Sequence, residues 1–393
     1  MARSKAKSRR DTPPHVAILV DTATGWGRRL IGGILGYVRQ HDPWYLWVEA
    51  KGRKEMLRLP DGWSGQGIIA RVSTPEMARH LKSFKIPVIN ISSIKLRETR
   101  FPTVATDLRE CGRLACEYFL NRGFKHFAYC GPFRLSYIHE HSRSFADYLE
   151  EAGYTCSIFR PRTAQRIQGG WGDSSEELID WLSTLPKPVA VLTWETQYGR
   201  QVLDACRLIG LDVPGDVAVL GGDDDDLLCQ VAFPPLSGIA TPAEAIGYEA
   251  ARMLDARVRG SRKIEQMLLK PSVVITRQST DTLAIEDEEL KLAIRFMREH
   301  VHEPIQIPDI LRHVPISRSV LERRFQSLLG RSPAAEIRRL HLERARQLLV
   351  ETDLSIEVVA KRSGFTSPEY FTSVFRPEYG QTPLQYRKHN RGH

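Results

Sequence analysis

Several features that would assign this chain of 393 residues to a large class of proteins are absent from it. No apolar run reaches the roughly 18 residues that a membrane-spanning helix needs. The first fourteen residues are basic, but no apolar core follows them, so we do not expect a secretory signal. The six cysteines lack C-x-x-C spacing and have apolar neighbours, which favours buried free thiols over disulfides or zinc ligands. We therefore expect a cytoplasmic protein.

The residue combinations that would indicate catalysis are also missing. No paired carboxylates or Ser/His/Asp arrangement stands at a spacing typical of an enzyme, and no cofactor motif is present. The acidic run Asp223–Asp226 contains the ligand type that hard metal ions prefer. Four consecutive side chains cannot all point at one ion, so one or two of them are expected to face a ligand. We expect no metal, no cofactor and no enzymatic activity.

Positive charge is distributed unevenly along the chain. The formal net charge is +9, and residues 291–393 hold 18 Lys/Arg against 11 Asp/Glu. Residues 1–14 hold five basic residues against one acidic residue, which leaves a slightly acidic middle. Because lysine and arginine contacts to phosphates supply much of the affinity for nucleic acid, the C-terminal part is the candidate DNA-binding region. We interpret residues 1–14 as a disordered basic tail that is either simply solvated or touches DNA transiently.

A pattern in the last hundred residues occurs twice. Residue types that begin, fill and end a helix recur fifty positions later: Ser317, Leu321, Phe325, Gly330 and Pro333 correspond to Ser367, Phe371, Phe375, Gly380 and Pro383. Serine caps the start of a helix, and glycine takes the left-handed conformation that ends one. A shorter helix is expected before each copy, over residues 308–313 and 355–363. The repeat therefore predicts two helix-turn-helix units.

A long amphipathic helix is expected between the two units, from Pro333 to about Glu351. At 1.5 Å per residue a helix of this length spans about 27 Å, which is close to the roughly 34 Å between successive major-groove faces of one duplex. It is expected to act as a rigid spacer. One chain could then read two adjacent turns of DNA.

The run from Gly364 to Phe375 and the following run from Tyr379 to Arg387 resemble the signature of AraC-type transcription regulators. The resemblance covers about residues 290–390 and implies sequence-specific binding to double-stranded DNA, and hence association with the nucleoid. The alternative is a helical interaction bundle that does not bind DNA. The exposed stripes of the two recognition helices supply the candidate DNA-binding residues: Arg318, Ser319, Glu322 and Arg323 in the first, and Pro368, Glu369, Thr372 and Ser373 in the second.

From His15 onward, short apolar runs alternate with amphipathic stretches. This alternation is typical of βαβ units and parallel sheets. In open α/β sheets, ligands bind beyond the carboxyl ends of the strands, so the loops there are candidate binding sites. The expected strands are residues 15–20, 45–50, 67–70, 87–91, 127–130, 189–193 and 217–220. The expected helices are residues 30–40, 75–82, 108–122, 141–152, 176–184 and 198–209.

Three segments of this α/β region resemble lac-repressor-type sugar sensors: Thr106 to Ala128, Gly210 to Asp223, and Pro234 to Ala251. The resemblance implies a two-lobed fold like that of type I periplasmic binding proteins over residues 15–280. A linker over residues 281–289 would then lead to the DNA-binding domain over residues 290–393, with Asp287 as the cap of its first helix. The N-terminal helix-turn-helix of lac-repressor-type proteins is absent, because the body begins at once with a strand.

The combination of the two domains resembles regulators of sugar operons. It implies a homodimeric activator controlled by a small sugar, D-xylose or a related pentose, with RNA polymerase as a possible further partner. The rival interpretation is a sugar-binding or sugar-processing protein whose helical tail serves assembly only.

Sugars are bound by planar polar groups and by an aromatic face. Asp107 and Asp223 occupy positions that usually contact sugar in the resembling proteins, although each could instead cap a loop. The two tryptophans among the other candidates could instead be core aromatics. This chain also departs from the pattern after the fifth strand, where it reads Trp194-Glu-Thr in place of the usual aspartate. The remaining candidate ligand-binding residues are Asp21, Trp26, Arg28, Arg143 and Trp194.

Overall fold

The computed structural model describes residues 13–50, 58–60, 62–94, 96, 100–132, 136–160, 176–284 and 287–391. The chain forms two compact units, one running up to Thr106 and again over Ala243–Leu269, the other over Asp107–Pro242 and Lys270–Arg391. The first unit is called the first lobe. The second unit contains the second lobe, up to residue 284, and a helical domain from residue 287. No helix in the described part of the chain is long and apolar enough to cross a membrane.

The first lobe is built on a six-stranded sheet in the order β11-β5-β4-β3-β1-β2, in which every neighbouring pair is parallel. Parallel neighbours need crossover connections, and three helices of the lobe lie against the sheet faces. The strands are β1 (His15–Leu19), β2 (Tyr45–Val48), β3 (Gly67–Ala70), β4 (Val88–Asn90), β5 (Thr103–Thr106) and β11 (Gln266–Leu269). The helices are α1 (Gly25–Gln40), α2 (Pro75–Ser83) and α8 (Ala243–Val258).

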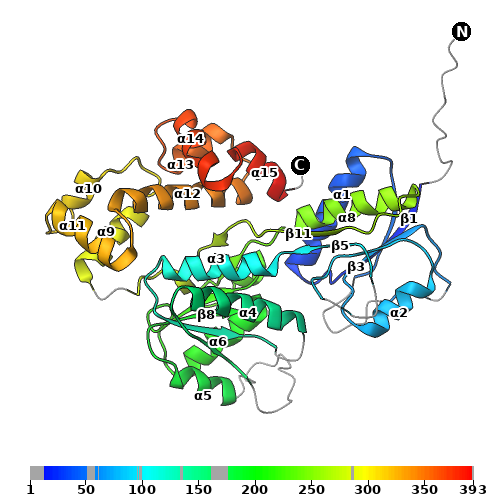
Figure 1. The fold of residues 1–393 in the computed structure, drawn as a ribbon, viewed down its shortest axis with the longest axis horizontal. Helices are drawn as coiled ribbons and strands as arrows, with labels where there is room; N and C mark the ends of the chain where they lie inside the picture. Colours follow the sequence, from blue (N-terminus) through cyan, green and yellow to red (C-terminus); the bar gives the residue numbers. More distant parts are fainter. Residues whose placement is uncertain are drawn as a thin grey trace, which may run out of the picture. The chain divides into compact units, whose positions relative to one another are not determined.

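Helices α1 and α8 cover one face of this sheet and α2 covers the other (Figure 1). Helices α1 and α8 pack so closely that glycine is required where they touch. A Cβ atom at Gly33 would lie 1.9 Å from the carbonyl oxygen of Glu244, and one at Gly247 would lie 2.0 Å from that of Leu30. Residues far apart in the sequence are thereby joined into one lobe.

The second lobe has a six-stranded sheet in the order β12-β10-β9-β8-β6-β7, parallel except for the β10–β12 pair. Its strands are β6 (His126–Cys130), β7 (Cys156–Ile158), β8 (Val189–Thr193), β9 (Val217–Gly221), β10 (Ser237–Ile239) and β12 (Val274–Ile275). Its helices are α3 (Leu108–Leu120), α4 (Ser136–Glu151), α5 (Glu176–Thr184), α6 (Thr196–Leu208) and α7 (Asp226–Gln230), with a short 3-10 turn η1 (Gln278–Thr280).

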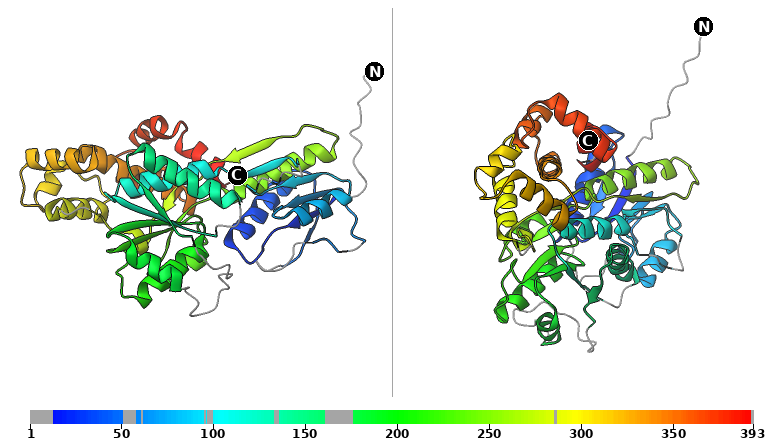
Figure 2. Two further views of the ribbon diagram at one scale, coloured as in Figure 1. Left: turned by 60° about the horizontal axis from the view of Figure 1, so that its bottom comes forward. Right: turned by 60° about the vertical axis from the view of Figure 1, so that its left-hand side comes forward.

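Strand β8 shows why these strands read as continuous apolar runs. Its residues Ala190 and Leu192 pack toward α3 and α4, whereas Val189 and Val191 pack toward α5 and α6. Figure 2 shows the sheet of the second lobe between these two layers of helices. A parallel sheet covered on both faces needs apolar side chains at consecutive positions.

The helical domain is organised around the 19-residue helix α12 (Pro333–Glu351). The first half of α12 contributes Ile337 and Leu340 to a core with α9, α10 and α11. The second half contributes Ala345 and Leu349 to a separate core with α13, α14 and α15. Figure 1 shows the two groups of helices at successive positions along α12. The other helices are α9 (Glu288–Glu299), α10 (Ile307–Leu311), α11 (Arg318–Leu329), α13 (Ile356–Arg362), α14 (Pro368–Tyr379) and α15 (Pro383–Arg391).

The predicted fold class, two α/β lobes of the periplasmic-binding-protein type followed by an all-α domain, is confirmed. The predicted spacer matches α12 at both ends, and Asp287 caps α9 through its bond from the Leu290 amide. Helix α9 begins at Glu288, inside the segment predicted as a linker. All six cysteines are free, and five of them are buried.

Several element boundaries were predicted wrongly. Helix α4 starts at Ser136 rather than residue 141, and α6 starts at Thr196 rather than residue 198. Strand β2 ends at Val48, two residues earlier than expected. Five strands of two to four residues (β5, β7, β10, β11 and β12) were not predicted, because strands this short carry too little periodicity to be recognised. The helices α7, α8 and α15 were not predicted either.

Glu336 is a buried charge that fixes the start of the spacer helix. Its side chain is 1 % exposed and forms ion pairs with Arg331 and, at 2.9 Å, with Arg339. Burial alone would raise the pKa of this carboxyl group, but the hydrogen bonds and charges of the two arginines outweigh it and lower the pKa to about 2. The charged form is thus favoured in the folded protein.

We expect Glu336→Gln to lower the free energy of unfolding at pH 7 by about 3 kcal/mol, since it leaves two half-buried arginines without their buried carboxylate. A lowered folded-state pKa stabilises the protein above the pKa of the unfolded state and is lost as pH falls through the folded-state value. From pH 7 to pH 4 the difference between wild type and variant should therefore shrink by roughly 1 kcal/mol. Denaturant unfolding of the full chain at both pH values measures this, with the exposed Glu357→Gln as the control. An equal difference at both pH values would contradict the assignment.

Candidate functional site

The first helix-turn-helix unit consists of α10 and α11. The hydroxyl oxygen of Ser317 accepts the Val320 amide and caps α11, and Gly330 ends the helix with φ 66°. Leu321 and Phe325 are fully buried in the core shared with α12. The sequence thereby fixes which face of α11 is buried and leaves the opposite face in solvent.

The second unit, α13 and α14, repeats this construction. Ser367 caps α14 through the Tyr370 amide at 3.1 Å, Pro368 occupies the first turn, and Gly380 ends the helix with φ 70°. Phe371 and Phe375 are fully buried. Both copies of the repeat therefore have the predicted capping and the predicted buried stripe.

Most of the predicted DNA-binding residues are exposed. In the first unit Arg318 forms an ion pair with Glu322 at 2.9 Å across one turn of α11. In the second unit the Ser373 hydroxyl donates to the carbonyl of Tyr370, a half-exposed aromatic residue that was not predicted. The exposed candidates are Arg318, Ser319, Glu322, Arg323, Glu369 and Ser373, whereas Pro368 and Thr372 are half-buried. The two exposed stripes offer hydroxyl, carboxylate and guanidinium groups, which suit base edges and phosphates.

The first lobe carries a polar cluster where β1 and β3 end. Asp21 is only 7 % exposed, and its Oδ2 forms an ion pair with Nη1 of Arg71 at 2.8 Å. The Arg71 guanidinium also lies 5.7 Å from the ring centre of Trp26. Asp21 and Trp26 were predicted from the sequence and are brought together around Arg71. Arg28 is exposed and donates to the Thr22 carbonyl at 3.0 Å, so it does not join the ion pair.

Arg71 is a candidate site residue that was not predicted from the sequence. It stands directly after β3, at the carboxyl edge of the sheet where ligands of this fold class bind. That position was the signal that could have identified it. The tryptophan also packs against the core of the lobe, so both readings of Trp26, core aromatic and site residue, are compatible with its place.

In the second lobe, the loop after β9 is tied to the start of α6. Oδ1 of Asp223 accepts the Thr196 amide at 2.6 Å and the Thr196 hydroxyl at 2.7 Å. Asp223 therefore acts as a cap, the alternative considered from the sequence. Because these bonds use one carboxylate oxygen, the cap does not occupy the acceptor positions of Oδ2.

Trp194 follows β8 and packs beside a buried histidine. The ring of His141 lies 5.2 Å from that of Trp194, edge to face, and its Nδ1 is hydrogen-bonded to the Tyr129 hydroxyl at 2.9 Å. Burial lowers the pKa of His141 to about 4, so the imidazole is neutral at physiological pH. Trp194 is half-buried and contacts the core, which leaves one part of its surface accessible.

Asp107 and Arg143 complete the predicted set. Oδ1 of Asp107 accepts the amides of Arg109 and Glu110 at 3.0 and 3.2 Å and caps α3. Arg143 is exposed on α4, two residues after the buried His141. Since residues two apart on a helix do not share a face, Arg143 points away from the cluster of His141 and Trp194.

The acidic run after β9 does not converge on one point. Asp224 and Asp226 both form ion pairs with Arg277, at 2.7 and 3.3 Å, and Asp225 caps α7 through the Leu228 amide. Each carboxylate has a different partner from that of Asp223. Among the described residues, no group of three or more His, Cys, Asp or Glu side chains is placed to hold a metal ion.

Three family models match successive parts of the chain. A XylR N-terminal domain matches residues 15–108, a periplasmic binding protein-like domain matches residues 103–280, and a helix-turn-helix domain matches residues 310–389. The first two models overlap over residues 103–108, which include β5, the strand that precedes the second lobe. The third begins within α10 and covers the rest of both helix-turn-helix units.

Curated relatives match almost the whole chain. The xylose operon regulatory protein of Escherichia coli (strain K12) is 28 % identical, over 96 % of this chain and 97 % of the relative. That of Haemophilus influenzae is 27 % identical, over 95 % and 97 %. A solved structure of the xylose-binding transcription activator xylR covers 97 % of this chain and 99 % of its own, with 26 % identity and a TM-score of 0.61.

These matches leave no support for a helical tail that serves assembly only, since the same two-domain order recurs in proteins named as regulators. The chain is a DNA-binding transcription regulator that resembles the xylose operon regulators along its whole length, with a sugar-sensing body of the periplasmic-binding-protein type joined to an AraC-type helix-turn-helix domain.

Proposed function

We propose that this regulator is an activator of a sugar operon and that its effector is D-xylose or a related pentose. The observation that carries the proposal is the similarity over nearly the full length to xylose operon regulators. In the second lobe, Asp223 and Asp107 each use Oδ1 as a cap, so that Oδ2 can accept a sugar hydroxyl. Trp194 offers an aromatic surface for the C–H face of the ring.

The first lobe holds a candidate sugar-binding group of its own, the Asp21–Arg71 pair. A guanidinium held by a buried carboxylate is pre-organised, so little side-chain entropy is lost when its remaining N–H groups bind sugar oxygens. The Trp26 ring beside Arg71 further limits its motion.

As an activator in the cytoplasm the protein would bind operator DNA on the nucleoid as a homodimer and recruit RNA polymerase. The second lobe exposes three apolar side chains close together in the sequence: Leu227, Val231 and Phe233, at 62 %, 60 % and 81 %. Burying them against a second copy would remove apolar surface from water, which supports the dimer. Two chains would present four helix-turn-helix units to the operator.

D-Xylose at about 100 times its dissociation constant should add roughly 2.7 kcal/mol to the free energy of unfolding. Thermal unfolding of the full chain with D-xylose, D-ribose, L-arabinose, D-glucose and xylitol measures this.

Asp223→Asn keeps the cap oxygen for Thr196 and removes the charge, so we expect its sugar affinity to fall at least tenfold while its melting temperature without sugar stays near that of wild type. Asp212→Asn, at an exposed turn of the same lobe, is the control. Unchanged affinity in Asp223→Asn would remove this residue from the site.

Arg71→Gln tests the first lobe. Loss of the guanidinium leaves Asp21 buried without its ion-pair partner and removes the guanidinium N–H donors from the edge of the sheet, so we expect the affinity for the same sugar to fall by about tenfold. Arg79→Gln changes an exposed arginine of α2 in the same lobe and should have no effect. Isothermal titration calorimetry gives both affinities. Equal affinity in the two variants would mean that Arg71 serves the fold alone.

Arg323→Ala tests the DNA-binding assignment. If this exposed arginine of α11 binds a base edge, the variant should bind the duplex selected by wild type from a randomised pool about 5- to 150-fold more weakly, with relaxed preference at one position. If it binds phosphate, the loss should be uniform over sequences and the slope of affinity against salt should fall by about one ion. Arg207→Ala, on α6, is the control. Fluorescence anisotropy at several salt concentrations separates these outcomes, and wild-type affinity in Arg323→Ala would exclude both.

A further inference from the structure

A continuous series of polar contacts crosses the second lobe from the loop that carries Asp223 to the spacer helix α12. It starts at Asp224, whose Oδ1 forms an ion pair with Nη1 of Arg277 at 2.7 Å. Both side chains are about nine-tenths buried, at 8 % and 12 % exposed. This loop also lies directly on strand β10, since a Cβ atom at Gly238 would be 2.5 Å from the carbonyl oxygen of Asp223. The loop is therefore in direct contact with Arg277 and with β10.

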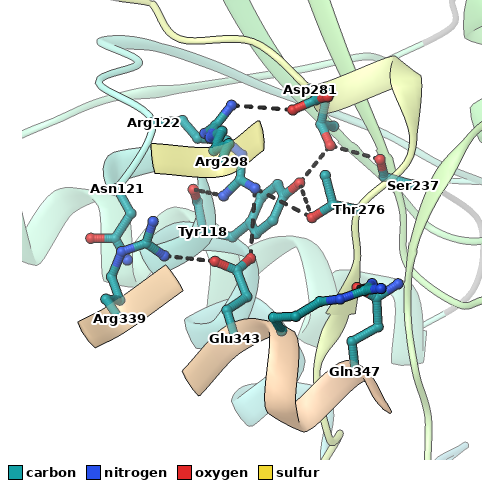
Figure 3. A network of polar contacts seen from close by, with 12 residues as sticks. Tyr118, Asn121, Arg122, Ser237, Thr276, Asp281, Arg298, Arg339, Glu343 and Gln347 are labelled. Atoms are coloured by element: carbon teal, nitrogen blue, oxygen red, sulfur yellow. Dashed lines mark hydrogen bonds and ion pairs between the residues drawn. The ribbon is translucent and has the colours of Figure 1, made fainter. Parts of the chain in front are cut away.

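The next contacts run through hydroxyl groups. The Arg277 amide donates to Oγ of Ser237 at 2.8 Å, and that hydroxyl is 2.6 Å from Oγ1 of Thr280. The same threonine hydroxyl is 2.6 Å from the hydroxyl of Tyr118, which also contacts Thr276 at 2.9 Å. Ser237 and Thr280 are fully buried, so these bonds are not exchanged for water. Figure 3 shows this row of hydroxyls leading to the ring of Tyr118.

The series ends on the helical domain. The guanidinium of Arg122 stacks 3.4 Å from the ring centre of Tyr118, and its Nη2 forms an ion pair with Oε1 of Glu343 on α12 at 3.6 Å. The Arg122 side chain is 3 % exposed. In Figure 3 Glu343 lies between Arg122 and Arg339, and Arg339 holds its other oxygen at 2.8 Å. Burial opposes the charge of Glu343, but the three arginines around it lower its pKa.

Helix α12 contacts the second lobe near both of its ends as well as at Glu343. Near its start, Nη1 and Nη2 of Arg331 donate to the side chain and the carbonyl of Asn121 at 2.8 and 3.0 Å. Near its end, Val350 packs on Val273 and Ile275 of the second lobe. The second helix-turn-helix unit is attached as well, because the Tyr386 hydroxyl donates to the carbonyl of Ser272 at 2.7 Å. The spacer helix and the segments at both of its ends thus contact the second lobe directly.

The centre of this contact is under-satisfied. Arg298, which forms an ion pair with Asp281 at 3.2 Å, lies close enough to Arg122 for the two positive charges to repel each other. Burial, and then the charge of Arg122, lower the pKa of Arg298 to about 10. Within the described residues, Nε of Arg122 and Nη2 of Arg298 are buried without a hydrogen-bond partner. Buried polar groups left unpaired raise the energy of the arrangement, which brings an alternative arrangement within reach of a ligand.

We propose that Arg122 and Glu343 are positioning residues that transmit the state of the sugar site to the spacer helix and so set the placement of both helix-turn-helix units on DNA. The proposal rests on the proposed function, in which a sugar binds at Asp223. Sugar held by this loop moves Asp224 and Arg277, the hydroxyl row repositions Tyr118, and Arg122 changes its hold on Glu343. The two residues touch neither sugar nor DNA. Their role is visible only in the coupling between the two binding events.

Glu343→Gln, Arg122→Gln and the double variant test the proposal as full chains. D-Xylose, or whichever panel sugar raises the melting temperature, is titrated by calorimetry, and the selected duplex is titrated by anisotropy without and with that sugar. Wild type should bind DNA about 5- to 150-fold more tightly with sugar, the usual range of allosteric coupling. Each variant should bind sugar within about twofold of wild type but lose the DNA enhancement to within about twofold. The double variant should lose no more than either single variant, because both act in one series.

Two further variants keep the test decisive if a buried charge cannot be removed without unfolding. Thr280→Val replaces the shared hydroxyl at nearly constant volume and should abolish the enhancement in the same way. Arg113→Gln, an arginine of α3 that pairs with Glu110 and Glu117, should leave the enhancement intact. Full enhancement in Glu343→Gln or in Thr280→Val would overturn the proposal while leaving the proposed function standing. A wild-type protein whose DNA affinity ignores every sugar of the panel would overturn the proposed function, and the proposal with it.

Discussion

The helical domain depends on one constraint, the division of α12 between two hydrophobic cores. Ile337 and Leu340 complete the core of the first unit, and Ala345 and Leu349 complete that of the second. Neither unit can bury its recognition helix without its half of α12. At 1.5 Å per residue the 19 residues of the helix span about 28 Å, so the distance between the two recognition helices is set by a rigid element. Helix α12 also contacts the second lobe, through Glu343 and Val350.

The carboxyl edges of the two sheets follow a different principle. Parallel strands end at one edge of a sheet, and the helices that follow them begin there with unpaired amides. Asp107 and Asp223 satisfy these amides with one oxygen each, and in doing so they are held rigidly with their second oxygen available. Capping and ligand binding, which were alternatives in the sequence analysis, are therefore compatible. A carboxylate fixed by a cap needs little further ordering to bind a hydroxyl.

The sequence predicts best the features that arise from local chemistry. Ser317, Ser367, Gly330 and Gly380 act where capping rules place them, and the fifty-residue repeat identifies both units. The candidate site was predicted in part, since Asp21, Trp26, Asp223 and Trp194 follow strands. Arg71, however, is recognisable only after the buried Asp21, fifty residues earlier in the chain, is seen to be its partner. Short strands such as β12 escape prediction for the same reason, since their pairing with distant strands defines them.

The contact between the second lobe and α12 is polar where an apolar contact would have been simpler. A buried ion pair such as Arg122–Glu343 returns little net stability, because desolvation offsets most of the attraction between the charges. It is nevertheless specific in geometry, since one displaced partner leaves an unpaired charge in a buried site. An apolar patch would tolerate sliding by an ångström and would pass on little of a small movement. In the proposed coupling, this layer of charges and hydroxyls has a few discrete arrangements of similar energy, and the sugar selects among them through its differential affinity. A polar contact therefore suits the transmission of a small movement from the second lobe to α12, whereas an apolar contact would suffice only to hold the helix in place.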